Sequence, residues 1–230
     1  MRALRILLIT AVILGGLFVA ADRLALNYAE DEVAKKIRAS QGLTATPDVS
    51  IKGFPFLTQV AGKELDQVDI GLDGVEATVG ERKVRITEMN ATLHQVRLEN
   101  NFSSAKAANA SGAARISYDD LRSVSEENVD LGYGGTGKIK VTGTVNVLGR
   151  TLTRSVLSGV TVTDNGSALR VRADEVPGEG IPGLEDLVRE RTDFDRKISG
   201  LPAGLKLVSA EPRADGLWIT VAGTGVDLAG

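Results

Sequence analysis

An uncharged apolar segment opens the chain. Two arginines come first, and residues 6–21 then carry no charge. A basic start, an apolar stretch and the small residues Ala20 and Ala21 at its end are together typical of an export signal. The stretch is slightly shorter than the roughly 20 residues that usually cross a bilayer. Two interpretations therefore remain open: residues 1–21 are a signal peptide that is cleaved off, or residues 4–21 stay in the membrane as a signal anchor.

The pattern over residues 22–41 is helical. Apolar residues recur on one face, every four positions: Ala25, Ala29, Val33 and Ile37. Acidic residues stand four positions before lysines on the exposed face, which supports a helix. We therefore expect an amphipathic helix directly after the apolar segment. Because basic residues before an apolar segment keep the N-terminus in the cytoplasm, we expect residues 22–230 to form a single exported domain.

After Pro47 the apolar residues alternate with polar ones, as they do in strands that have one buried and one wet face. The clearest strand covers residues 138–147, and the Asp-Gly pair at 73–74 indicates a turn between two shorter strands. Polar turn sequences at 164–166 and 215–216 each stand between apolar runs and predict β-hairpins. One-sided alternation of this kind is typical of antiparallel sheets.

Two further stretches complete the pattern. A short helix is predicted over residues 117–125, because Ser117 and Asp120 have the spacing of a capping box. The stretch over residues 100–114, rich in Ala, Ser and Asn, fits a loop and a weak strand equally well. The fold class that follows is α+β, with one long, curved antiparallel sheet and one substantial N-terminal helix.

The residue inventory excludes most catalytic sites. The chain has no cysteine and a single histidine, His94, so a thiolate, a disulfide and a pair of imidazoles are all unavailable. The histidine falls on the polar side of a strand pattern, which leaves a serine nucleophile without a base. Motifs for a phosphate-binding or calcium-binding loop are missing as well. We therefore expect a protein that is not an enzyme, with no catalytic residue, no metal site and no cofactor.

Charge and aromatic content exclude a further class of partner. The formal net charge is −3, and the chain has one Trp, three Tyr and five Phe. Binding to nucleic acid needs a basic surface and usually aromatic stacking platforms. We therefore expect no nucleic-acid partner.

A sheet with one apolar face has to bury that face against something. A single helix, about 10–12 Å wide, is narrow cover for so many strands. A curved sheet around it would leave an aliphatic groove, and a chain with few aromatic residues suits acyl chains better than flat rings. A closed core without a cavity is the alternative that the pattern leaves open.

The most distinctive motif of the chain, VSIKGFPFLTQV, covers residues 49–60. Weaker motifs accompany it: DRLA at 22–25, SYDDL at 117–121 and LPAGL at 201–205. In these segments, and over almost all of the chain after Ala21, the sequence resembles the LmeA-like family of actinobacterial envelope proteins, which are described as phospholipid-binding. The resemblance implies a tubular lipid-binding fold, in which a long curved sheet wraps around one N-terminal amphipathic helix and shelters acyl chains.

The resemblance and the apolar pattern together give a set of candidate lipid-binding residues. They lie on the helix, in the motif and on the following strand: Val33, Ile37, Phe54, Pro55, Phe56, Leu57, Val68 and Ile70. Two roles compete for the motif, a hydrophobic lip that touches the membrane and a buried plug whose rings pack inward. We favour the plug, because Pro55 restricts Phe54 to extended conformations and large apolar side chains are usually buried.

We therefore expect an exported protein of the cell envelope or a periplasm-like space, anchored to the plasma membrane if residues 4–21 are retained. It would bind phospholipid acyl chains in an aliphatic groove and serve lipid transfer or lipoglycan maturation. Its partners would be phospholipid and the membrane surface, and the sequence indicates no oligomeric state. The alternative is a non-enzymatic envelope scaffold with a closed core, which acts through protein partners.

Overall fold

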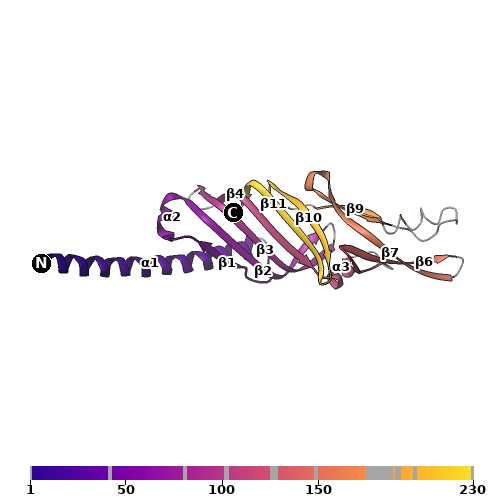
Figure 1. Ribbon diagram of the computed structural model, residues 1–230, viewed down its shortest axis with the longest axis horizontal. Coiled ribbons are helices and arrows are strands. Elements are labelled where there is room, and N and C mark those ends of the chain that lie inside the picture. The colour runs from indigo at the N-terminus through magenta and orange to yellow at the C-terminus, as the bar shows by residue number, and fades with distance from the viewer. Residues whose placement is uncertain are drawn as a thin grey trace.

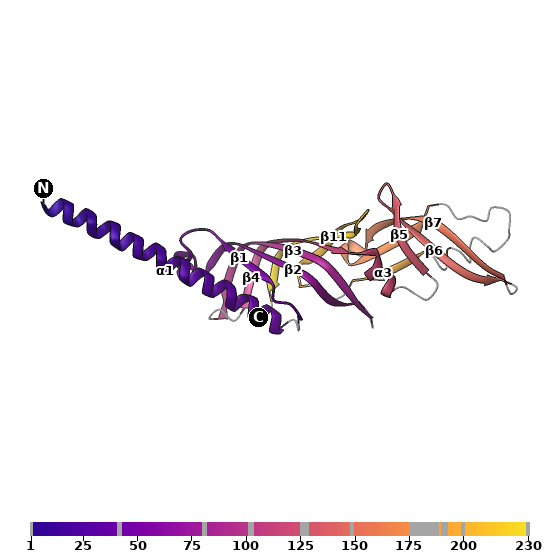
Figure 2. The same ribbon diagram turned by 90° about the horizontal axis from the view of Figure 1, so that it is seen from below.

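One long helix and two antiparallel sheets follow one another along an elongated molecule (Figure 1 and Figure 2). The computed structural model describes residues 2–40, 43–79, 82–100, 104–124, 129–147, 150–174, 189, 193–198 and 201–228. The predicted α+β class is confirmed. In the described part of the chain the strands divide into a six-stranded and a five-stranded sheet, where the sequence pattern suggested one long sheet.

Helix α1 (Arg2–Ser40) joins the apolar segment and the predicted amphipathic helix without a break. Residues 2–21 are exposed. Among the described helices, α1 alone is long and apolar enough to cross a membrane, a property that signal sequences near an N-terminus share. From Asp22 onward one face of the helix packs on the domain, where Asp22, Leu26 and Ala34 are buried.

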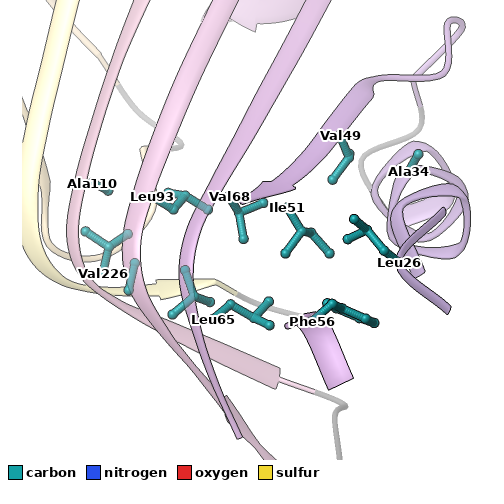
Figure 3. Close-up of a cluster of buried hydrophobic side chains, with 12 residues drawn as sticks. Leu26, Ala34, Val49, Ile51, Phe56, Leu65, Val68, Leu93, Ala110 and Val226 are labelled. Atoms are coloured by element: carbon teal, nitrogen blue, oxygen red, sulfur yellow. The ribbon is translucent and has the colours of Figure 1, made fainter. Parts of the chain in front are cut away.

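The six-stranded sheet has the order β1-β2-β3-β4-β11-β10, and all neighbouring strands are antiparallel. Its strands are β1 (Asp48–Lys52), β2 (Glu64–Val79), β3 (Arg82–Glu99), β4 (Ser104–Ile116), β10 (Leu205–Arg213) and β11 (Gly216–Leu228). Helix α2 (Phe56–Gly62) connects β1 to β2. The sheet curves strongly without closing into a barrel, as the close-up in Figure 3 shows.

Helix α1 lies beside β1, the edge strand of this sheet (Figure 3). The backbone N–H of Ile51 donates a hydrogen bond of 2.7 Å to Oε1 of Glu30. A side chain of the helix thus satisfies a donor at the sheet edge, which would otherwise be open to pairing with another strand. From Asp22 onward the helix buries only a narrow stripe, so it lies along one side of the curved sheet and is not enclosed by it.

The five-stranded sheet has the order β5-β6-β7-β8-β9. Its strands are β5 (Val129–Gly135), β6 (Lys138–Val147), β7 (Arg150–Thr163), β8 (Ala168–Ala173) and β9 (Phe194–Lys197). The 3₁₀ turn η2 (Asp164–Gly166) joins β7 to β8, and β10 pairs with β11, so both predicted hairpins are confirmed.

Helix α3 (Tyr118–Val124) connects the two sheets between β4 and β5 and confirms the predicted short helix. The backbone N–H of Asp120 donates to Oγ of Ser117 at 3.1 Å, and this hydroxyl donates to the Asp120 carboxylate at 2.6 Å. The two residues therefore cap the helix start as their spacing predicted. Because the chain turns through α3 after β4, the next strands form a separate sheet.

The predicted turn at 73–74 is wrong, since β2 runs straight through these residues. Gly74 has a φ of +66°, and Asp73 and Val75 on either side still pair with β3. The glycine changes which side of the strand faces inward, so that Leu72 and Val75 are both buried. The stretch that the sequence left undecided forms β4, one of the two central strands of the sheet, where pairing with β3 and β11 overrides the low strand propensity of alanine.

Candidate functional site

One face of the six-stranded sheet, which we call the inner face, is apolar across all six strands. A row across its middle consists of Val49, Ile70, Ala91, Gly112, Val221 and Leu207. The neighbouring row on the opposite face carries polar residues, among them Asp69, Thr92 and Ser111. Because strand residues alternate between faces, this register gives the sheet one apolar and one wet side, as the sequence predicted.

The floor of the inner face is made of small side chains along β4. The residues that point inward from this strand are Ala105, Ala107, Ala110, Gly112 and Ala114. Larger residues flank them, such as Met89 on β3 and Ile219 on β11, both of which pair with Ala114. β4 therefore contributes smaller side chains to the inner face than Met89 and Ile219 beside it do.

A first buried cluster covers the end of the inner face beside α1 and α2. Leu26 of α1 and Phe56 of α2 point toward Val68, Leu65 and Val226 of the sheet (Figure 3). These side chains are all buried. The cluster fixes both helices to the sheet and closes this end of the inner face.

A second buried cluster lies where the two sheets meet. Leu207, Ala210 and Leu217 of the six-stranded sheet pack with residues of the five-stranded sheet such as Val141, which is fully buried. Strand β10 makes this junction, since it contacts β7, β6 and β5. The second cluster closes the other end of the inner face.

Between the two clusters six residues of the inner face are only half-buried, although Leu72 and Val75 beside them on β2 are buried. This central strip comprises Ile70, Met89, Ala91, Ala114, Ile219 and Val221. Met89, Ala91 and Ala114 belong to neither buried cluster, while the other three lie at the rims of one or the other. The described residues therefore cover this apolar strip incompletely.

The candidate residues predicted from the sequence do not all meet at one place. The helical stripe is rotated, so Val33 is 37% exposed while Ile37 packs at the rim of the first cluster. Val68 is buried in this cluster, and Ile70 reaches the central strip. Ile37, Val68 and Ile70 thus lie at or beside the inner face, whereas Val33 is exposed to solvent.

The motif at 53–57 is divided between the two roles predicted for it. Phe56 is buried, and Leu57 packs at the rim of the first cluster, as a plug requires. Phe54 is 54% exposed instead, and Pro55 between the two rings is half-buried. The prediction that both rings pack inward is therefore wrong. Phe56 begins α2 and turns toward the sheet, whereas Phe54 precedes the helix and faces outward.

A buried carboxylate fixes this motif to α1. Oδ1 of Asp22 accepts a hydrogen bond of 2.8 Å from the backbone N–H of Leu57, in the first turn of α2. An anionic acceptor at the start of a helix stabilises the helix, because the first N–H groups lack partners within it. Asp22 is fully buried, and its Oδ2 has no hydrogen-bond partner among the described residues.

None of the described ionisable groups with a shifted pKa belongs to the central strip. Burial, with Tyr133 and Asp215 nearby, raises the pKa of Tyr118 to about 12. The hydrogen bond from Arg170 lowers the pKa of the Asp195 carboxyl on an exposed surface. In the described parts of the chain, no group of three or more His, Cys, Asp or Glu side chains is placed to bind a metal ion.

The comparison with protein families agrees with this geometry. The profile of the LmeA-like phospholipid-binding family matches residues 20–222. The chain belongs to this family. Comparison with curated proteins and with solved structures found no significant match. The family supports lipid binding, and the match begins where α1 starts to pack on the domain.

Sequence reasoning missed the half of the central strip that lies beyond β2. Ala91 and Ala114 carry a weak signal, because alanine is common in many structures and the stretch around β4 fitted a loop as well. Ile219 and Val221 were predicted to be strand residues, but only the pairing of β11 with β4 brings them to this face. The signal that points to them is the alternation itself, once the strand order is known.

Proposed function

We propose that the protein binds phospholipid by its acyl chains along the central strip of the inner face, while α1 keeps the domain at the membrane. The central strip carries this proposal, since it is a half-buried apolar surface between two buried clusters and includes the small side chains of Ala91 and Ala114. Aliphatic side chains without charged neighbours in the same row suit an acyl chain. Family membership supports the same class of ligand.

The length of the apolar part of α1 supports retention as an anchor. An 18-residue window with a mean hydropathy of 2.4 is about 27 Å long at 1.5 Å per residue. The hydrocarbon core of a bilayer is about 30 Å thick. In this proposal the domain is exported and stays in the envelope, where a tethered lipid-binding domain would serve lipid transfer or lipoglycan maturation.

The test is mass analysis of lipid extracted from the full chain after purification in a mild detergent. We expect phospholipid in near-stoichiometric amount. Ala114→Phe should strongly reduce the bound lipid, because the ring occupies the middle of the central strip where the acyl chain would lie. Ala113→Phe is the matched control: it changes the adjacent residue on the same strand, which faces the other side of the sheet, and should leave the lipid in place.

Circular dichroism of both variants establishes that they fold. Wild-type protein that is reproducibly free of lipid would contradict the proposal and favour the alternative, an envelope scaffold with a closed core. Equal loss of lipid from two folded variants would place the ligand elsewhere on the molecule.

A further inference from the structure

The end of the domain that carries α2 lies where the apolar part of α1 stops (Figure 1 and Figure 2). Residues 2–21 of α1 are exposed, and Asp22 is the first residue buried in the domain. If the apolar part lies in a bilayer, as proposed above, Asp22 marks the bilayer surface. Helix α2 and the loop before it then face the headgroups directly.

The loop before α2 cannot swing freely away from that surface. It is held to α1 from both sides, by the hydrogen bond from Leu57 to Asp22 at 2.8 Å and by the hydrogen bond from Ile51 to Glu30 at 2.7 Å. Since α1 continues without a break from the apolar segment into the domain, the orientation of the helix also sets the orientation of the loop.

The side chains exposed at this end have the chemistry of a membrane interface. The Phe54 ring is 54% exposed, and Leu24, two residues beyond Asp22, is 72% exposed. The guanidinium carbon of Arg23 lies 5.1 Å from the centroid of the Phe54 ring. Aromatic rings and arginines gather at headgroup level in membrane proteins, because each combines an apolar body with a polar or charged group.

We propose that Arg23 and Phe54 form a second contact with the bilayer that holds α1, in which the ring enters the headgroup region and the guanidinium binds a lipid phosphate. This contact rests on the proposed anchor. It would also fix the orientation of the domain relative to the bilayer, which a flexible tether would not do. It places the end of the inner face covered by α2 next to the bilayer, so that Phe56 stands between the lipid surface and the central strip.

The absence of cysteine makes a direct test possible, because one introduced cysteine can carry a fluorophore without a background label. The full chain is reconstituted into vesicles of phosphatidylcholine and phosphatidylglycerol. Three variants are labelled: Phe54→Cys at the contact, Val12→Cys in the apolar part of α1, and Leu157→Cys, an exposed apolar position on the five-stranded sheet. Quenching by aqueous iodide and by brominated lipid measures where each label lies.

We expect lipid to quench the labels at 12 and 54, and iodide to quench mainly the label at 157. Arg23→Gln in the Phe54→Cys variant should restore much of the iodide quenching at 54, because the guanidinium no longer binds phosphate. A label at 54 that is as open to iodide as the label at 157, while the label at 12 is in lipid, would overturn the contact and leave the anchor intact. A label at 12 that is open to iodide would overturn both, and lipid extraction tests the central strip separately.

Discussion

The hydrogen bond from Leu57 to Asp22 gives the sharpest prediction about how the domain is held to its helix. Asp22→Ala removes the only acceptor that the described residues offer to the Leu57 N–H, which is partly buried at the start of α2. Leaving a buried donor without a partner costs about 1–3 kcal/mol. A loss of about 2 kcal/mol in the local stability of the α2 start corresponds to an increase of about 30-fold in the equilibrium constant for its opening.

Amide-resolved hydrogen exchange on the full chain in detergent micelles measures this opening. We expect the Leu57 amide to exchange about 30-fold faster in Asp22→Ala than in the wild type, from the same free energy. Asp22→Asn keeps an acceptor oxygen but loses the charge, so its effect should be smaller. Glu30→Ala is the matched control, because it frees the Ile51 amide on β1 and should leave the Leu57 amide protected.

Two outcomes would refute this reasoning. Unchanged exchange at Leu57 in Asp22→Ala would show that α2 is held by the packing of Phe56 alone. An equal increase at amides throughout both sheets would show that Asp22 stabilises the whole domain, and that α2 has no local opening.

Three further predictions concern other parts of the molecule. Phe56→Ala should lower the free energy of unfolding by about 3–5 kcal/mol in a denaturant titration, whereas Phe54→Ala should leave it nearly unchanged because its ring is exposed. The pKa of Tyr118 is raised from 10.0 to about 12, so the unfolded chain loses this proton first, and stability should fall as the pH rises from 10 to 12. Tyr118→Phe should abolish that alkaline slope and cost about 1 kcal/mol at neutral pH, through the lost hydrogen bond to the carbonyl of Arg213. Finally, the intact mass of protein purified from membranes should include residues 1–21, and a mass that begins near Asp22 would show cleavage.

Local patterns were enough to predict the elements whose cause is local. The apolar segment, the helix after it and the capping box of Ser117 and Asp120 depend on residues within a few turns of each other, so their spacing is visible in the sequence. The two hairpins likewise depend on short polar turns between apolar runs. Alternation also predicted that the sheet has one apolar side.

The elements that the sequence missed depend on contacts between distant residues. β4 is rich in alanine and became recognisable as a strand only through its pairing with β3 and β11. The turn predicted at 73–74 fails for the same reason: Asp-Gly favours a turn locally, but pairing with β3 on both sides of Gly74 keeps the strand continuous.

The candidate site shows the same division between sequence and tertiary structure. By itself the sequence determined that the chain has an N-terminal apolar helix, one-sided strands, no cysteine and a single histidine, because these are properties of composition and period. Only the tertiary structure decided that Phe56 is buried while Phe54 is exposed, that Asp22 holds α2, and that Ala91 and Ala114 lie together in the central strip. These features arise where residues far apart in the chain pack together. No local sequence pattern predicts which of two neighbouring rings will be buried.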